Sequence, residues 1–350
     1  MGSRANMIIV EGGSYGIYYD HWAAQTMDRK VFWGPEHVFK WIISHPKEQP
    51  EPWLDQAWCE GGILLDLDRR LLLFFGGENL PYDFTLKETF LKLLPYNWSG
   101  WETHWAKRGI VDFAEYVGHD LNDVISKVEQ KKLSYEKAQK LISEPISIHY
   151  AKVLISIADN NGCGAALCMD THGWGHYLSL GEELLALIKD VTTRQTIEIG
   201  YDEGVQEGFH IDAVNKRLLV WDMSSYGVWN PDAIKQQWPS WEVVYLLDDF
   251  LHHLRLLGSR VSLESVDENS VLETLKGIVC AEEREASAYT SSLEALVSHG
   301  YKVEANPRIF QTTPMAFGEI SREKQFEEIR EQYLRSPNRL NWKTLVSDNR

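Results

Sequence analysis

WSGWETHW at residues 98–105 and WPSWEVVY at residues 238–245 share one pattern, W-x-x-W-E with an aromatic residue three positions after the glutamate. The two copies lie about 140 residues apart. Self-similarity at a long separation is the mark of a repeated structural unit. A duplication therefore predicts further matches on either side of each copy, in the same order.

Three more pairs of segments match in that order: 60–75 with 206–221, 7–21 with 153–172, and 33–42 with 179–188. In the clearest pair, EGGILLDLDRRLLLFF aligns with QEGFHIDAVNKRLLVW if one residue is inserted in the turn. This alignment places Asp66 opposite Asp212 and Arg70 opposite Arg217. The sequence predicts two tandem units, 7–145 and 146–290, followed by an unduplicated extension, 291–350.

Each unit carries the same succession of patterns. Short β-rich runs with glycine turns come first, then a helix, a hairpin turning near Asp68 or Asn215, another helix, and the W-x-x-W-E strand. Hairpins mixed with helices are typical of an α+β protein. We expect two units of mainly antiparallel sheet with helices, related by a pseudo-twofold axis. The charged run SREKQFEEIREQYLR predicts a C-terminal helical tail.

The repeated tryptophans have a structural interpretation. In an extended segment Trp101 and Trp105 share one face, as Trp241 and Tyr245 do in the second copy. Trp98 and Trp238 precede these strands and could pack on the preceding helix. A duplicated core explains duplicated tryptophans more simply than an aromatic binding platform does.

Charge and composition exclude several classes of protein. The formal net charge is −16, so phosphate backbones repel the chain and neither nucleic acid nor an anionic membrane is an expected partner. Apolar runs are too short for a transmembrane helix. Four cysteines are too few for a disulfide framework. We expect a cytoplasmic protein that needs no cofactor.

The charge is unevenly distributed along the chain. Residues 1–145 carry 16 basic and 21 acidic side chains, residues 146–290 carry 10 and 22, and residues 291–350 carry 9 and 8. The second unit is therefore the acidic one and could steer a basic partner. The alternative is that this charge serves only solubility.

Two pairs of carboxylates recur in the units. Asp66 with Glu102, and Asp212 with Glu242, could converge as acid and base, because nearby carboxylates can split their pKa values. The aspartates could equally serve in their hairpins, beside Arg70 and Arg217. The structural interpretation is the stronger one.

The clearest difference between the units is CGAALCMDTHGWGH, residues 163–176. It offers side chains of the types that bind zinc: Cys163, Cys168, Asp170, His172 and His176. Their spacing fits no standard metal motif, so a plain loop or a binding loop ranks above a metal site. P-loop, G-x-G-x-x-G and H-E-x-x-H motifs are missing from the sequence.

These observations favour a cytosolic protein-binding or inhibitor module, of the antitoxin or immunity type, that recognises a basic partner through an acidic surface containing aromatic residues. The expected partner-binding residues are Asp202, Glu203, Asp248, Asp249 and Trp174. The alternative is a metal-assisted hydrolase that uses Asp170, His172, His176, Asp212 and Glu242, with a metal bound by Cys163, Cys168, His172 and His176. A purely structural role is a third hypothesis.

Overall fold

The computed structural model describes most of the chain: residues 3–45, 47, 53–126, 133–143, 151–160, 162–169, 174–192, 195–199, 205–223, 231–263, 265–281, 297–300, 302, 321–340 and 342. Both predicted boundaries between units, at residues 145 and 290, fall outside these ranges.

The first unit contains one five-stranded sheet in the order β2-β1-β3-β4-β5. Its elements follow one another along the chain as β1 (Ala5–Glu11), β2 (Ser14–Asp20), α1 (Met27–Val31), α2 (Pro35–Ile43), β3 (Gly61–Asp66), β4 (Leu71–Phe75), α3 (Phe84–Leu93), β5 (Glu102–Trp105) and α4 (Ile110–Val117).

The second unit contains a second five-stranded sheet, in the order β11-β10-β9-β6-β7. Its elements are β6 (Ala151–Asp159), β7 (Gly162–Met169), α6 (Trp174–Leu178), α7 (Leu184–Val191), β8 (Ile197–Ile199), β9 (Glu207–Asp212), β10 (Arg217–Asp222), α8 (Pro231–Gln237), β11 (Glu242–Tyr245), α9 (Phe250–Leu257) and β12 (Val261–Leu263). The helix that precedes β6 in the chain, α5 (Tyr135–Ser143), packs on α7 and on β7 of this second sheet. Short β8 and β12 pair with each other. Two helices follow, α10 (Glu268–Val279) and α12 (Arg322–Arg335).

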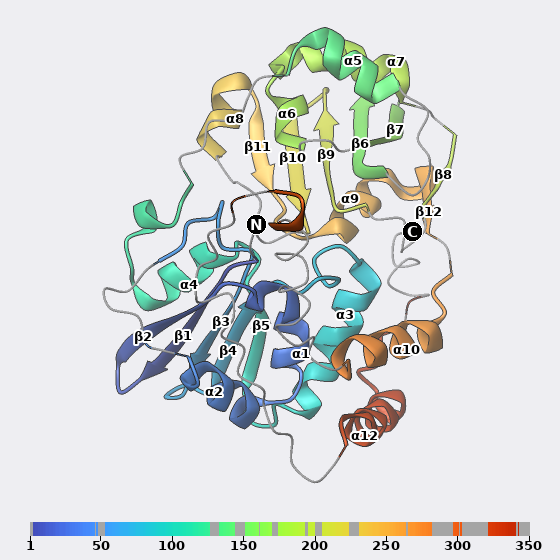
Figure 1. Cartoon of the computed structure of the whole chain (residues 1–350). Coiled ribbons are helices and arrows are strands. Elements are labelled where there is room, and N and C mark those ends of the chain that lie inside the picture. Colours follow the sequence, from blue (N-terminus) through green and yellow to red (C-terminus); the bar gives the residue numbers. More distant parts are fainter. Residues whose placement is uncertain are drawn as a thin grey trace.

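The predicted fold class is confirmed: the chain is α+β, with two similar units and a C-terminal helix (Figure 1). Strands β1, β2, β3, β4 and β5 occupy the same places as β6, β7, β9, β10 and β11. The expected hairpins are antiparallel, but β1 pairs with β3 and β4 with β5 in parallel. The sheets are therefore mixed: α3 carries the chain from β4 to a parallel β5, and the helices after β2 bring β3 back parallel to β1 rather than to β2.

The hairpin of each unit corrects the predicted alignment. Asp66 pairs with Leu71, and Asp212 pairs with Arg217, so both turns contain four residues and neither has an insertion. Arg70 therefore corresponds to Lys216, and both residues have a positive φ, 53° and 52°. Leu71 corresponds to Arg217. The basic residues of the two turns had been aligned by type, whereas the turn geometry fixes the register.

The repeated W-x-x-W-E motif builds the same contact twice. The indole N–H of Trp98 donates to the carbonyl oxygen of Val31 at 2.8 Å, and that of Trp238 donates to Leu178 at 2.9 Å. Each ring meets the second tryptophan of its motif edge-on. Both anchoring tryptophans are fully buried, which confirms that the motif is a duplicated part of the core.

A glycine beside each tryptophan motif allows the chain to pass closely. Gly34 and Gly181 both have positive φ, and a Cβ on them would lie 2.6 Å and 2.7 Å from a backbone carbonyl oxygen, of Asn97 and Gln237 respectively. Only glycine fits such a position without displacing the backbone. The duplication thus extends to backbone details that the sequence alone did not show.

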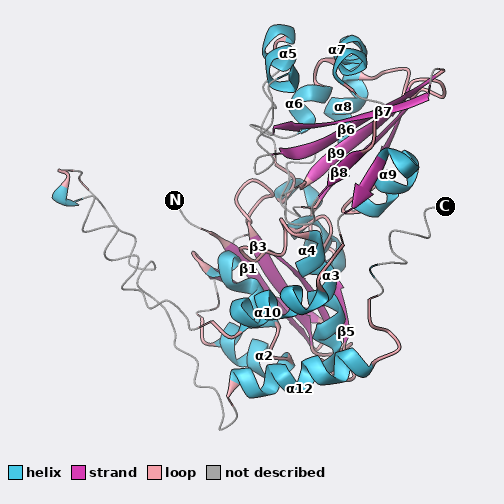
Figure 2. Cartoon of the chain, turned by 90° about the vertical axis from the view of Figure 1, so that its right-hand side faces the viewer, coloured by secondary structure: helices cyan, strands magenta, loops and turns pink. Residues whose placement is uncertain are grey.

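The core of the first unit also receives helices from the end of the chain. Leu272, Leu275 and Val279 of α10 belong to that core, as do Phe326 and Ile329 of α12. Figure 2 shows both helices beside the first unit. The second sheet instead has separate apolar clusters on its two faces, one under α6, α7 and α8 and the other under α9.

Candidate functional site

The two units meet at a buried ion-pair cluster. Asp248, just before α9, accepts from the Nζ atoms of Lys87 at 3.1 Å and Lys107 at 2.7 Å. The Lys87 side chain is only 1% exposed, whereas that of Lys107 is 49% exposed. Burial opposes ionisation of Asp248, but the two lysines outweigh it and lower the pKa of that carboxyl. Beside it Phe84 of α3 packs on Phe250 of α9, so this junction fixes one unit against the other (Figure 1).

The junction changes the interpretation of the predicted partner-binding residues. Asp248 is neutralised by the first unit, and its side chain is only 10% exposed, so it is not part of an open acidic surface. Asp249 caps α9 by accepting from the backbone N–H of His252 and lies 3.5 Å from Arg255. It remains 41% exposed. The two neighbouring aspartates therefore serve different purposes.

The other residues predicted for partner binding are not brought together in the described part of the chain. Asp202 and Glu203 lie outside the described residues. Trp174 begins α6, but the placement of its side chain is not described.

A different group of acidic side chains gathers where the hairpins of the second sheet turn. We call it the acidic edge: Glu182, Glu183, Asp212 and Glu242, together with the exposed Val214 of the same turn. Lys216 lies in this turn too and interacts with Glu182. The strand register places the β9–β10 turn beside the start of β11, since Asp212 pairs with Arg217 and Arg217 pairs with Glu242. Glu182 joins them because its carboxylate accepts from the Trp241 indole N–H at 2.9 Å and from the Ser240 hydroxyl at 3.2 Å.

Hydrogen bonds hold two carboxylates of the acidic edge, Glu182 and Asp212, and favour their ionised form. Hydrogen bonds from Trp241 and Ser240 lower the pKa of Glu182. Burial opposes ionisation of Asp212, but donors from Asn215 and Val214 outweigh it and lower its pKa as well. Glu242 pairs with Arg217 at 2.8 Å. Among these charges Val214 presents an apolar side chain that is 56% exposed.

The same edge of the first unit is built differently. Pro35 stands where the second unit has Glu182, and Arg69 stands where it has Asn215. Asp66, the counterpart of Asp212, is buried and accepts from the Tyr116 hydroxyl at 2.6 Å. Asp68, the counterpart of Val214, accepts from the backbone N–H groups of Gly12 and Gly13. The first edge therefore offers fewer available carboxylates.

The duplicated carboxylate pairs do not meet. Asp66 and Glu102 lie on β3 and β5, on either side of β4, and both are in register with Leu71. Asp212 and Glu242 are separated in the same way by Arg217 on β10. Two strand spacings amount to about 9–10 Å between backbones. Asp212 caps its turn and Glu242 binds Arg217, which supports the structural interpretation over acid and base catalysis.

The predicted metal set is not a single site. Cys163 and Cys168 are five positions apart on β7, so their side chains point to opposite faces of the sheet. Cys163 packs with the cluster under α9, and Cys168 belongs to the cluster on the other face. Burial raises the pKa of the Cys168 thiol to about 12. The positions of the two cysteines therefore do not support the alternative in which both bind one metal ion.

The remaining members of the hydrolase alternative give no support to it. Asp170 and His172 lie outside the described residues, and His176 is in α6 without a described side chain. Within the described ranges no group of three or more histidine, cysteine, aspartate or glutamate side chains could hold a metal ion.

Sequence reasoning missed a buried polar chain in the second unit. The Trp221 indole N–H donates to His253 Nδ1 at 2.8 Å, and Ser156 Oγ lies 2.6 Å from His253 Nε2 and 2.7 Å from His210 Nδ1. All four residues are buried. Such a group contains the residue types of nucleophilic catalysis, but substrate could not reach Ser156. The four residues come from β6, β9, β10 and α9, and only the fold brings them together.

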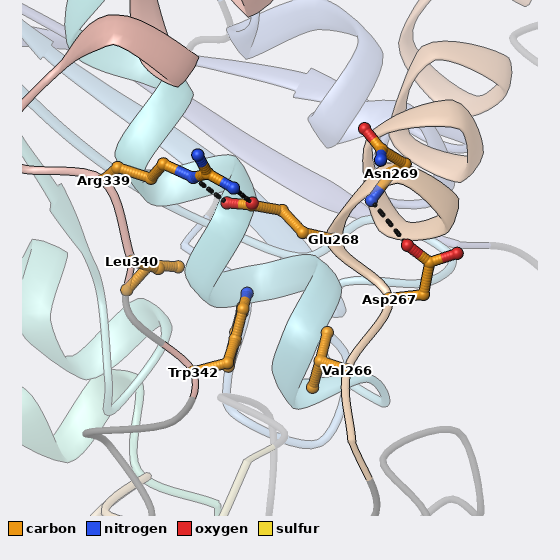
Figure 3. Close-up of a pocket in the computed structure, with 7 residues that line it drawn as sticks. All are labelled: Val266, Asp267, Glu268, Asn269, Arg339, Leu340 and Trp342. Atoms are coloured by element: carbon orange, nitrogen blue, oxygen red, sulfur yellow. Dashed lines mark hydrogen bonds and ion pairs between the residues drawn. The ribbon is translucent and has the colours of Figure 1, made fainter.

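A cavity of about 500 Å³ lies at the start of α10 (Figure 3). Its lining residues are Val266, Asp267, Glu268, Asn269, Arg339, Leu340 and Trp342. Arg339 binds Glu268, and Asp267 accepts from the backbone N–H of Asn269. The charged groups of the cavity wall are thus already paired with other groups of this same protein.

Comparisons with known proteins add no assignment: neither the models of protein families, nor the curated proteins, nor the solved structures gave a match to this chain. Through the described ranges of the chain, every helix is too short or too polar to span a bilayer.

Proposed function

We propose that this chain is a protein-binding module, of the inhibitor or immunity type, that recognises a basic partner protein through the acidic edge of its second unit. The observation that carries the proposal is the arrangement of fixed carboxylates around the exposed Val214. We further propose that it acts in the cytoplasm.

The geometry of the acidic edge suits rapid and specific association. Ionised groups already held by hydrogen bonds lose little conformational freedom when a partner binds. Glu182 and Asp212 are held in this way, by Trp241 and by the turn. Complementary charge mainly raises the association rate, and a central apolar side chain within a polar rim is the usual anatomy of a recognition surface. Val214 provides that centre.

The overall charge supports the same partner. Residues 146–290 carry 10 basic and 22 acidic side chains, which makes this segment the source of most of the net charge of −16. A field of one sign over a surface raises the local concentration of oppositely charged proteins. Asp249 is available to contribute, and Asp202, Glu203 and Trp174 remain proposed contacts, whereas Asp248 is used within the junction.

The duplication offers a matched pair of variants for testing this surface. Glu183→Gln with Glu242→Gln removes two charges from the acidic edge. Glu36→Gln with Glu102→Gln removes the same number from equivalent positions of the first unit. All four glutamates are exposed, so both variants should fold normally.

Tagged wild type and both variants should be purified from the organism that encodes the chain, at low ionic strength, and examined by native mass spectrometry. We expect a stoichiometric protein of high isoelectric point with the wild type and with the first-unit variant. Its occupancy should fall by about tenfold or more in the second-unit variant, as the loss of 1.4 kcal/mol or more in binding would produce. A partner that is acidic, or equal occupancy in the two variants, would contradict the proposal.

A further inference from the structure

The buried polar chain of the second unit replaces an apolar cluster of the first. Ile8 and Leu64 are partners across β1 and β3, as Ser156 and His210 are across β6 and β9. Phe75 and Phe113 pack edge-on in the first unit. Trp221 is the equivalent of Phe75, since each is the fifth residue of its strand, β10 or β4. His253 is the equivalent of Phe113, since each is the fourth residue of its helix, α9 or α4. The same backbone therefore carries an apolar cluster once and a hydrogen-bonded chain once.

The indole of Trp221 fixes the tautomer of His253, and the remaining direction is the one that gives the Ser156 hydroxyl hydrogen an acceptor. An indole nitrogen can only donate, so His253 Nδ1 accepts and its Nε2 carries the proton. That Nε2–H donates to Ser156 Oγ, whose hydroxyl then donates to His210 Nδ1. Both imidazoles are thus neutral, with one defined tautomer each.

We propose that this buried polar chain, Trp221–His253–Ser156–His210, makes the packing of α9 acid-labile. Acidification then releases α9 from the second sheet and loosens the junction between the two units.

The intact polar chain has no free acceptor for an added proton. The two unprotonated ring nitrogens are His253 Nδ1 and His210 Nδ1, and both already accept a hydrogen bond. Protonation of His253 would place an N–H on its Nδ1, which would then face the indole N–H of Trp221, so that two donors would meet without an acceptor. Protonation of His210 would leave the Ser156 hydroxyl hydrogen without its acceptor. Burial is the largest cause that lowers the pKa of His210 to about 4, and it lowers that of His253 well below its usual range.

The charges around the chain do not remove this preference for neutral imidazole. On β9, Asp212 favours the charged form of His210, but burial outweighs it. On α9, His252 opposes protonation of both imidazoles. The other titratable or charged groups on the packed elements are Arg255 on α9, Arg260 in the turn after it, Cys163 and Cys168 on β7, Lys152 and Asp159 on β6, Glu207 on β9, and Arg217 and Asp222 on β10. Strand alternation places Asp159, Cys168, Glu207 and Asp222 on the face of the sheet away from α9.

The linkage has a definite sign and range of pH. A released histidine binds a proton near its ordinary pKa of 6.5, whereas His210 in place does so only near 4. The stabilisation of α9 is therefore complete above pH 6.5 and is lost as the pH falls toward 4. For one such histidine, the ratio of released to packed α9 should increase about 20-fold between pH 7 and pH 5.

Release of α9 would weaken the contact with the first unit, because both contacts of the junction are made at the start of α9. Asp248 precedes α9 by two residues and holds Lys87 and Lys107. Phe250 is its first residue and packs on Phe84 and on Trp221. In the first unit, by contrast, burial raises the pKa of the buried Asp28 to about 7. Its protonation favours folding in the same pH range, so global unfolding would mix two opposite effects.

Hydrogen–deuterium exchange of individual helices separates these effects. Protection of peptides covering α9 and α4 should be compared at pH 7 and pH 5, after correction for the pH dependence of intrinsic exchange. We expect protection of α9 to fall about 20-fold and that of α4 by less than about threefold. A variant carrying the first unit's residues, Ser156→Ile, His210→Leu, Trp221→Phe and His253→Phe, should show no fall in α9.

The wild-type chain decides the question even if this variant fails to fold, because α4 is an internal control. Constant protection of α9, or an equal loss in α9 and α4, would overturn the proposal. So would a folded variant whose α9 loses protection as the wild type does.

Discussion

Replacement of Asp248 by Asn should lower the free energy of unfolding by about 3–5 kcal/mol, because it leaves the ammonium group of Lys87 buried opposite a neutral amide. The Lys87 side chain is 1% exposed, so water cannot replace the lost carboxylate without rearrangement of α3 and α9. Urea unfolding at pH 7.5 measures the loss. The junction should open first, so fluorescence of the nearby Trp105, whose ring lies 5.5 Å from Lys87, should report it.

Two further variants identify the cause of this loss. Lys107→Met removes the exposed partner of Asp248 and should cost less than about 1 kcal/mol. The double variant Lys87→Met with Asp248→Leu removes both buried charges and should recover most of the stability lost in Asp248→Asn. If Asp248→Asn costs no more than Lys107→Met, the buried pair does not hold the units together.

Replacement of His253 by Ala should cost about 3 kcal/mol at pH 7.5. The change opens a cavity between α9 and the sheet and leaves the Trp221 indole N–H and the Ser156 hydroxyl without their buried partner. At this pH both buried imidazoles are neutral, so the measurement reports the packing of the polar chain rather than its titration.

His252→Ala is the matched control for this change. His252 is the preceding residue of the same helix and is only partly buried, so its replacement should change the free energy of unfolding by less than about 1 kcal/mol. Equal losses in the two variants would show that the effect does not depend on the polar chain through Ser156.

The duplication was predictable because it depends on local patterns. W-x-x-W-E predicted the same strand and the same buried tryptophans in both units, and the indole contacts to Val31 and Leu178 show why the motif was repeated. The hairpin alignment was less secure, because Arg70 and Arg217 look alike in sequence. The register instead depends on four-residue turns with a positive φ at Arg70 and Lys216.

The candidate sites were harder to predict because they depend on contacts between distant segments. Asp248 reads as one more acid in an acidic unit until Lys87, 161 positions away, is placed beside it. Ser156, His210 and His253 come from three separate elements, and no spacing in the sequence connects them. A comparison of equivalent positions could have found them, since Ile8 and Leu64 occupy the same places in the first unit.

The two units have therefore diverged in different ways from a common plan. The first has an apolar cluster under α4 and receives α10 and α12. The second has a polar chain under α9 and the acidic edge at its hairpin turns. Both differences place the candidate functions in the second unit, on a scaffold that the first unit shares.

The most direct test of this account is the association rate of the purified chain with the partner recovered from its own organism, measured by stopped-flow fluorescence from about 20 to 300 mM salt. Steering by the acidic edge predicts a rate for the wild type that falls by about tenfold or more over this range. The Glu183→Gln, Glu242→Gln variant should be slower at low salt and less sensitive to salt, whereas the Glu36→Gln, Glu102→Gln variant should match the wild type. A rate that is independent of salt, or that changes equally in both variants, would contradict recognition through the second unit.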